Sequence, residues 1–512
     1  MYRKVNSEQL GIEEFFLPFG GKLQKDNRWV KMAEIMPWDL IELTYLKTMS
    51  SEKGRTAYSA RLAYGAIFIK EHEGLTDEQT VTAITENPYM QYFLGMSVFT
   101  ETAPFDASMM VHFRKRFPVE DLAIINEAIC LGKTPEKTRN VDRNDSNDNQ
   151  DNSDNDNNNS APPADGIGQA KSWEGKPNKN TSKKKQKRQK KNRGKLLMDA
   201  TVAPADIKYP TDIDLLNQCR EHLEKAIDLL WNNMPHTRHK LPYSKKNARK
   251  SYLNLAKSKR WTNAKCKKAI GDQLRFVGLA YSTLKEYEQQ IPGYEKLYPY
   301  WLMNRLAVIP KVYEQQKQMY ESGTHKCNER IVSLQQPHVR PINRGKRPNP
   351  TEFGQKLHLS VVNGYTYLEQ TSWENFNEGT DLIATAEDYR RKFGYYPEVI
   401  LADKIYQTRS NREYCSEHGI RLSGPPLGRR KASQTDEKIH NQMYRDACER
   451  NAIEGRNGNA KRRWGLNRIM TKLDETSKTE AMLNIIAMNV SHKLALWFLR
   501  FFQIFSEKPI FQ

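Results

Sequence analysis

The sequence lacks the features that mark secreted and membrane-spanning proteins. Its N-terminus, Met-Tyr-Arg-Lys-Val-Asn-Ser-Glu, has no apolar core of the kind found in signal peptides. Its most apolar segment, Ala481–Phe505, is interrupted by polar and charged residues, so we interpret it as a buried or amphipathic helix and not as a membrane span. The six cysteines are scattered and form no Cys-x-x-Cys pair, which argues against a disulfide framework or a zinc knuckle. We therefore expect a cytoplasmic protein with no membrane partner.

Acidic residues are outnumbered by basic ones. The 81 Lys and Arg residues exceed the 61 Asp and Glu residues, and the formal net charge is +20 at pH 7. A surplus of this size favours a polyanionic partner, with nucleic acid as the first candidate and an anionic membrane surface as the second. The length of 512 residues, 38% of them hydrophobic, is sufficient for several domains.

Residues 1–138 are expected to form a helical N-terminal domain. Apolar residues recur three and four apart over much of residues 29–131, for example in Trp38–Tyr45 and Arg61–Ile69. Several short helices with a basic exit at Arg114-Lys115-Arg116 are typical of a helix-turn-helix DNA reader. The alternative is an ordinary helical domain with a solvated basic turn.

Residues 139–193 have the composition of a disordered, low-complexity linker. An Asp- and Asn-rich run is followed by a dense basic run that includes Lys183, Lys184 and Lys185. Such a segment cannot bury enough apolar surface to order itself. The basic run is either a solvated tail or an arm that follows DNA phosphates, and its position just before an apolar strand favours the arm.

Residues 212–345 are predicted to be a helical insertion. Asp214–Trp231 has a helical period, and a second helix is expected from about Asn263 through Leu284. This block is rich in Lys, Arg and Tyr but contains no catalytic constellation. The Pro- and Arg-rich stretch Pro337–Pro350 is predicted to be an extended connector.

Residues 194–211 and 346–512 predict an α/β core. Leu196–Pro204 is a near-continuous apolar run of the kind found in strands buried on both faces. Asn363-Gly364 lies between two alternating runs, which is the strongest short hairpin signal. The remaining pattern alternates strands with helices: strand Glu398–Asp403, helix Arg409–Glu417, strand Ile420–Ser423, helix Thr435–Glu454 and helix Glu480–Phe505. This order predicts a mixed sheet covered by helices.

Three carboxylates occupy settings suited to a shared metal site. Asp199 interrupts the first strand, Asp403 ends a later strand, and Glu454 lies on a helix. Taken alone, Asp199 would be interpreted as an ordinary aspartate at a strand end whose oxygens have hydrogen-bond partners. Two-metal catalysis on phosphodiesters needs several carboxylates at one point, so the three together indicate a Mg²⁺ site. Four other acidic residues fit less well because they fall in loops or on a helix expected at the surface: Asp206, Asp212, Asp381 and Asp388.

Basic residues follow Glu454 at a characteristic spacing. Arg450, Glu454 and Lys461 fit the pattern Tyr-x2-Arg-x3-Glu-x6-Lys, although Ala447 stands at the Tyr position and Tyr444 lies one turn earlier. Gly455, Asn457 and Gly458 predict that the helix stops just after Glu454, which leaves Lys461 on a loop.

The sequence resembles the DDE transposases of bacterial insertion sequences. The resemblance is carried by this Arg-Glu-Lys spacing, by the stretch from Glu454 to Ile469, and by Met198-Asp199-Ala-Thr and Leu401-Ala-Asp403, which match the two preceding acidic motifs. Residues 29–131 are similar to the helical N-terminal domain of the same transposases. The resemblance covers roughly residues 29–131, 194–211 and 352–495.

The resemblance implies a fold, a cofactor and a set of roles. The fold would be an RNase H-like core, with Asp199, Asp403 and Glu454 as a catalytic triad that holds two Mg²⁺ ions, or Mn²⁺. By resemblance, Arg450 and Lys461 would contact phosphates of the transposon end. Apart from the resemblance, we expect DNA contacts from other basic residues: Arg462, Arg463, Lys183, Lys184 and Lys185. The expected activity is metal-dependent cleavage of transposon ends and strand transfer into target DNA by a nucleoid-associated homodimer. The alternatives are a non-catalytic DNA-binding protein derived from a transposase and a metal-dependent nuclease without strand transfer.

Overall fold

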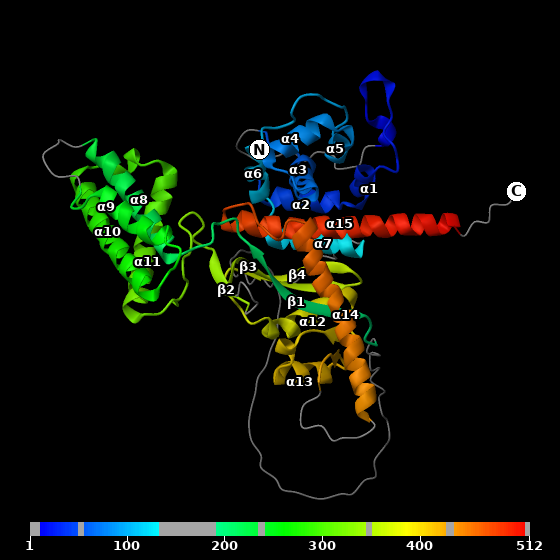
Figure 1. Ribbon diagram of the computed structural model, residues 1–512. Coiled ribbons are helices and arrows are strands. Elements are labelled where there is room, and N and C mark those ends of the chain that lie inside the picture. Colours follow the sequence, from blue (N-terminus) through cyan, green and yellow to red (C-terminus); the bar gives the residue numbers. More distant parts are fainter. Residues whose placement is uncertain are drawn as a thin grey trace, which may run out of the picture. The chain divides into compact units, whose positions relative to one another are not determined.

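The computed structural model of the protein describes residues 11–49, 56–132, 191–233, 241–344, 351–425 and 435–506 (Figure 1). The predicted linker 139–193 falls outside these ranges except for its last three residues. Lys183, Lys184 and Lys185 therefore lie outside the described residues, and their predicted DNA contact stays a prediction.

A mixed six-stranded sheet forms the centre of the fold. The central strand β1 pairs antiparallel with β3 on one side and parallel with β5 on the other. β3 also pairs antiparallel with β4 and β2, and β5 pairs parallel with β6. The five strands β4-β3-β1-β5-β6 thus follow the 3-2-1-4-5 order of an RNase H-like sheet, which confirms the predicted fold class. The strands are β1 (Lys195–Pro204), β2 (Arg340–Asn343), β3 (Thr351–Val362), β4 (Tyr365–Ser372), β5 (Val399–Leu401) and β6 (Arg421–Leu422).

The predicted hairpin is confirmed between β3 and β4. Asn363 and Gly364 both have positive φ, at 52° and 81°. Two consecutive residues of this kind make the tight turn whose twist matches the strands on either side.

Helices cover both faces of the sheet. On one face, Leu197 of β1 and Leu401 of β5 pack with Ile453 of α14 (Thr435–Arg463). On the other face, Leu196 and Met198 belong to a core shared with α12 (Leu382–Phe393) and α13 (Arg409–Glu417). Because side chains alternate along a strand, Asp199 lies on the same face as Leu197, toward α14.

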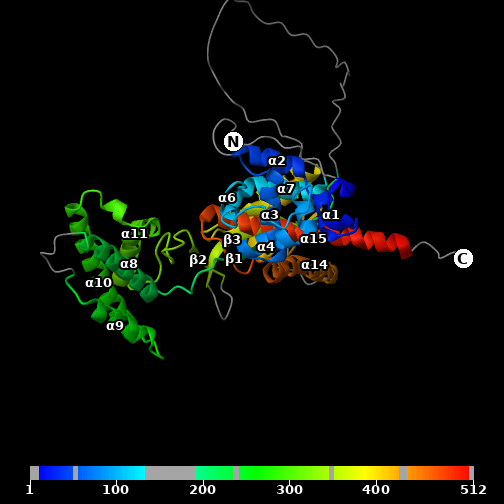
Figure 2. The same cartoon turned by 90° about the horizontal axis from the view of Figure 1, so that it is seen from above.

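The helical N-terminal region shares its core with the long helix α15 (Asp474–Ser506). Figures 1 and 2 both show α15 running alongside the N-terminal helices, and one hydrophobic cluster joins buried residues of α1, α3, α6 and α7 to Met482, Ile486 and other residues of α15. The N-terminal helices are α1 (Arg28–Ile35), α2 (Trp38–Lys47), α3 (Ala60–Glu73), α4 (Asp77–Glu86), α5 (Pro88–Phe93), α6 (Met109–Lys115) and α7 (Val119–Leu131). Among the described helices, α15 is long and apolar enough to cross a membrane by length and composition, but 56% of its apolar window is buried inside the protein. This burial is what a core helix requires.

The helix that carries Glu454 is longer than predicted. α14 continues without a break from Thr435 to Arg463, so the expected stop after Glu454 is wrong. Ile453, Asn457, Ala460 and Trp464 are buried at helical spacing on one side of this segment. Their packing outweighs the roughly 1 kcal/mol per residue by which Gly disfavours a helix interior.

Gly455 offers a direct check of this explanation. A Cβ added to Gly455 meets nothing within 4 Å. Gly455→Ala should therefore raise the free energy of unfolding by about 0.5–1 kcal/mol, measured by chemical denaturation. The matched control is Gly194→Ala, which should be destabilising because Gly194 has φ +80° and an added Cβ collides with the Tyr389 hydroxyl. A loss of stability in Gly455→Ala would contradict a regular helix at this point.

The insertion between β1 and β2 has its own hydrophobic core. Its helices are α8 (Asp212–Trp231), α9 (Lys245–Ala256), α10 (Asn263–Gln290) and α11 (Tyr300–Ser322). Leu216, Leu223, Val277 and Leu302 are among the buried residues that join α8, α10 and α11. The connector predicted at Pro337–Pro350 is partly wrong, because Arg340–Asn343 pair with β3 as strand β2. Short 3-10 helices complete the described chain at Ile12–Glu14, Pro18–Gly20, Tyr294–Leu297, Glu378–Asp381 and Lys404–Tyr406.

Candidate active site

Asp199 lies half-buried in the middle of β1, on the face covered by α14. The side-chain amide of Asn457 donates a hydrogen bond of 2.9 Å to Asp199 Oδ2. Burial raises the pKa of Asp199, and the nearby Glu454 adds to this, whereas the Ala200 amide and the cations of Arg344 and Arg450 oppose it. A half-buried carboxylate is stabilised by nearby positive charge, which Arg344 and Arg450 supply in this structure.

The strand register brings Asp403 to the level of Asp199. β1 and β5 run parallel, and their last Cα pair is Leu197 with Leu401. Asp403 is two residues beyond Leu401, and Asp199 is two residues beyond Leu197, so the two residues lie side by side just past the end of the β1–β5 pairing. Asp403 is exposed, and its Oδ1 accepts a hydrogen bond of 2.7 Å from the Lys404 amide, which starts a 3-10 helix. A very short strand followed at once by a turn therefore fixes the Asp403 backbone.

The continuous helix α14 explains the spacing of the basic and acidic residues that follow. At 3.6 residues per turn, Glu454 lies about 40° and Lys461 about 20° from Arg450 around the helix axis. The three side chains therefore form one stripe. Arg450 Nη2 lies 3.2 Å from Glu454 Oε1, and Lys461 Nζ lies 4.0 Å from Glu352 Oε2 of β3.

All three predicted triad residues line one cleft. The cleft has a volume of about 850 Å³, and Asp199, Asp403 and Glu454 are on its wall together with Arg450 and Lys461. Its other side includes Lys356, Asn375 and Glu378, where Lys356 Nζ bonds both Asn375 and the Glu378 carboxylate. Arg462 and Arg463 do not line the cleft. They are exposed at the end of α14, about 100° and 200° around the helix from Lys461.

The donor set fits a hard divalent cation, although the side chains are not gathered around a single point. Carboxylate and amide oxygens are the ligands preferred by Mg²⁺, and this cleft offers three carboxylates from three elements. Within the described residues, no group of three or more His, Cys, Asp or Glu side chains is close enough to hold a metal ion. Glu454 is paired with Arg450 and its side chain is 56% exposed, so it can change rotamer freely. A metal ion held by all three carboxylates would require the Glu454 side chain to leave Arg450.

Sequence reasoning missed two residues that contact the predicted site. Asn457 lies one turn after Glu454, and a continuous helix would have placed it on the same side; its Oδ1 is buried with no hydrogen-bond partner among the described residues. Arg344 donates a hydrogen bond of 3.1 Å to the Ala200 carbonyl and lines the cleft. No sequence signal points to Arg344, because it follows a strand that was predicted to be a connector.

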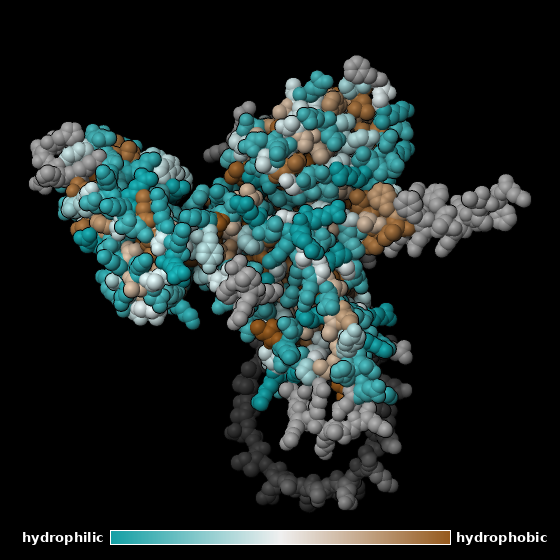
Figure 3. All heavy atoms as spheres, viewed as in Figure 1, coloured by the Kyte–Doolittle hydropathy of each residue, from teal (hydrophilic) through white to brown (hydrophobic). Residues whose placement is uncertain are grey.

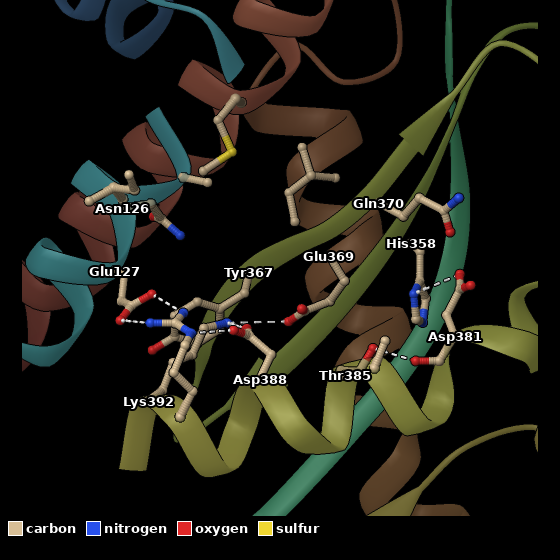
Figure 4. Close-up of a pocket in the computed structure, with 16 residues that line it drawn as sticks. Asn126, Glu127, His358, Tyr367, Glu369, Gln370, Asp381, Thr385, Asp388 and Lys392 are labelled. Carbon is tan, nitrogen blue, oxygen red and sulfur yellow. Dashed lines mark hydrogen bonds and ion pairs between the residues drawn. The ribbon is translucent and has the colours of Figure 1, made fainter. Parts of the chain in front are cut away.

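A second cavity, of about 470 Å³, lies between α7, β4 and α12 and is shown in Figure 4. Asp381 and Asp388 line it, so both are half-buried beside this cavity and not simply on the surface as predicted. Arg391 of α12 makes two hydrogen bonds to Glu127 of α7, at 2.6 and 3.0 Å. Lys392 lies 2.5 Å from Asp388 and 3.5 Å from Glu369 of β4. The network ties an N-terminal helix to the sheet, and we interpret it as structural.

Lys392 tests this interpretation. Its side chain is 8% exposed, and the pKa of Lys392 is raised because Glu369 and Asp388 outweigh the lowering effect of burial. Lys392→Met would remove the cation beside Glu369 and leave Asp388 with Arg391 alone, so we expect a loss of about 3 kcal/mol in the free energy of unfolding, measured in urea. Lys250→Met, at an exposed position, should change it by less than about 0.5 kcal/mol. Equal effects of the two substitutions would show that the network contributes no stability.

The strand order, the helices on both faces and the acidic cleft together define an RNase H-like protein with a carboxylate-lined site. Two family models then match the chain. A model described as "Transposase DDE domain" matches residues 400–491, and a model described as "Transposase domain (DUF772)" matches residues 18–116. Two separate segments of the chain are therefore similar to transposase domains, which confirms the resemblance to DDE transposases seen in the sequence. The first match contains Asp403 and Glu454, whereas Asp199 and the helical insertion lie outside both.

One curated relative covers a small part of the chain. It is a Rhizobium meliloti protein described as "Uncharacterized protein ORF8 in nfe locus", and it is 36% identical over 93 residues. The matched segment is 18% of this chain and 44% of the relative, so less than half of the relative is represented. No solved structure matches the chain.

Proposed function

We propose that the protein is a metal-dependent DNA transposase that cuts the ends of its element and joins them to target DNA. The observation that carries this proposal is the cleft in which Asp199, Asp403 and Glu454, from three distant segments, lie with Arg450 and Lys461. The transposase DDE match over two of the three carboxylates supports it.

Each residue of the cleft has a separate task in this proposal. Two Mg²⁺ ions, or Mn²⁺, held by the three carboxylates would supply Lewis acidity at the phosphorus and lower the pKa of the attacking water. Arg450 and Lys461 bind the flanking phosphates of the transposon end, because both cations lie on the stripe of α14 that faces the cleft. Asn457 holds the Asp199 carboxylate in one orientation through its amide.

One site can serve both reactions. In the first, water attacks phosphorus and the bond to the 3′ oxygen breaks, which leaves a 3′-hydroxyl and a 5′-phosphate. In the second, the freed 3′-hydroxyl attacks a phosphorus of target DNA and displaces its 3′ oxygen. Both are in-line phosphoryl transfers with the same charge distribution. Since two ends must be held together, we expect a homodimer on DNA, with further contacts from the N-terminal helices, Arg462, Arg463 and the basic linker run at Lys183–Lys185.

The experiment uses the full chain, DNA fragments taken from both sides of its gene, Mg²⁺ and a target plasmid. We expect cut ends and plasmid-joined products on a gel, and neither without a divalent cation. Cut ends without joined products would identify a nuclease. Binding with a steep salt dependence but no cutting would identify a non-catalytic DNA-binding protein.

A further inference from the structure

The helical insertion contains a long stretch without any acidic residue. From Leu229 to Gly271 the sequence has no Asp or Glu, although Lys and Arg are frequent. The described part of this stretch comprises α9, the turn after it and the first turns of α10. Neither the proposed chemistry nor the family matches account for this charge.

Nine cations of this stretch are exposed, and we call them the basic face. None of the nine makes an ion pair with a carboxylate among the residues that the structure describes. Three of them lie on one stripe of α9: Lys246, Arg249 and Lys250. They also line a groove whose wall contains five cations and two carboxylates in all. The basic face consists of Lys246, Arg249, Lys250, Lys257, Lys259, Arg260, Lys265, Lys267 and Lys268.

The basic face is carried on a rigid scaffold. α9 packs against α10 through the buried Ala248, Leu255 and Ala269. Gln273 of α10 donates a hydrogen bond of 3.0 Å to the Ala248 carbonyl, and Ser251 bonds Asp272 at 3.1 Å. The cations are therefore presented as a fixed array and not as a loose tail, and the visible surface of this helical block is mainly hydrophilic (Figure 3).

We propose that the basic face binds the phosphate backbone of duplex DNA next to the cleaved end, an inference that rests on the proposed DNA substrate. The 12 residues of α9 span about 18 Å, and a duplex of that length carries about ten phosphates. An array of unpaired cations over this distance is complementary to such a backbone. Trp261 follows Lys259 and Arg260 in the turn before α10. Its side chain is 47% exposed, so it can pack against a sugar or a base.

A membrane surface fits this face less well. An interfacial helix needs an apolar side that inserts below the headgroups. The apolar side of α9 is already buried against α10, which leaves its exposed surface polar and basic. The face thus offers charge without the apolar surface that anchors a helix in lipid.

The test compares two triple variants of the full chain, measured by fluorescence anisotropy with a short duplex over a range of NaCl concentrations. K246Q/R249Q/K250Q should bind about tenfold or more weakly near 0.1 M salt, and the slope of log K against log salt should become shallower by about 2 to 3. K246R/K250R should keep the wild-type slope. The control K296Q/K311Q/K317Q removes three cations from other parts of the insertion, where Lys311 is paired with Glu329 and Lys296 follows Glu295.

Each outcome decides the inference. An unchanged slope in K246Q/R249Q/K250Q, in a protein that still cuts DNA, would overturn the basic face alone and leave the proposed function standing. A wild-type protein that neither binds nor cuts DNA would overturn both. The basic face would be assigned to a membrane instead if the wild-type protein bound phosphatidylserine vesicles and K246Q/R249Q/K250Q lost this binding but kept its DNA binding. Equal slopes in the test and control variants would also contradict the inference, because charge alone would then be responsible.

Discussion

Replacement of Asp403 by Asn is expected to reduce cleavage of end-bearing DNA by more than about 100-fold while DNA binding persists. Residues that only support metal ligands typically cost 10- to 100-fold when they are lost, so a ligand should cost more. The Asn side chain keeps the shape of Asp403 and its hydrogen bond to the Lys404 amide, which isolates the loss of charge. Asp199→Asn and Glu454→Gln should give losses of the same order. The measurement is the single-turnover cleavage rate at saturating Mg²⁺.

Asp206→Asn is the matched control for this prediction. Asp206 follows the same strand as Asp199, but it pairs with Arg468 and does not line the cleft. Its substitution should leave the cleavage rate within a few-fold of wild type. If Asp206→Asn impaired cleavage as much as Asp403→Asn, the loss would reflect general charge or folding and not a shared metal site.

Asn457→Ala should lower the affinity for Mn²⁺ by about 10- to 100-fold, as measured by electron paramagnetic resonance of the free ion. In the proposed site Asn457 is a positioning residue, because its amide donates a hydrogen bond to one oxygen of Asp199 and contributes no charge of its own. Alanine is the better helix former, so the helix itself should not be weakened. Part of the lost cleavage activity should return at high Mg²⁺ concentration.

Asn459→Ala controls for the substitution itself. Asn459 is two residues further along α14, about 200° around the helix, and it is not on the cleft wall. We expect wild-type Mn²⁺ affinity from this variant. Unchanged Mn²⁺ affinity in Asn457→Ala would show that the hydrogen bond to Asp199 has no part in metal binding.

The fold and the grouping of the three carboxylates could be predicted because each signal is local. Asp199 interrupts an apolar strand, and the Asn363-Gly364 turn sets the β3–β4 pairing. The spacing of Arg450, Glu454 and Lys461 is physically informative once α14 is known to be continuous, since it defines one stripe of a helix. The catalytic and DNA-binding roles of these residues stay predictions.

Features that depend on tertiary packing could not be predicted. Gly455 and Gly458 signal a helix end locally, but the burial of Ile453, Ala460 and Trp464 against the rest of the fold keeps the segment helical. Arg344 reaches the cleft only because Arg340–Asn343 add a strand to β3. The charge of the insertion is visible in the sequence, but only the packing of α9 on α10 shows which cations are exposed together.

Hydroxyl-radical cleavage tests most sharply whether the three carboxylates hold one metal: Mg²⁺ is replaced by Fe²⁺, ascorbate and peroxide are added, and the cuts in the protein backbone are mapped. Because the radicals act only close to the bound ion, we expect cuts near residues 199, 403 and 454 together. All three cuts should disappear in Asp403→Asn or with excess Mg²⁺. Cuts near only one of these residues, or none that Mg²⁺ suppresses, would show that the three carboxylates do not share a metal site.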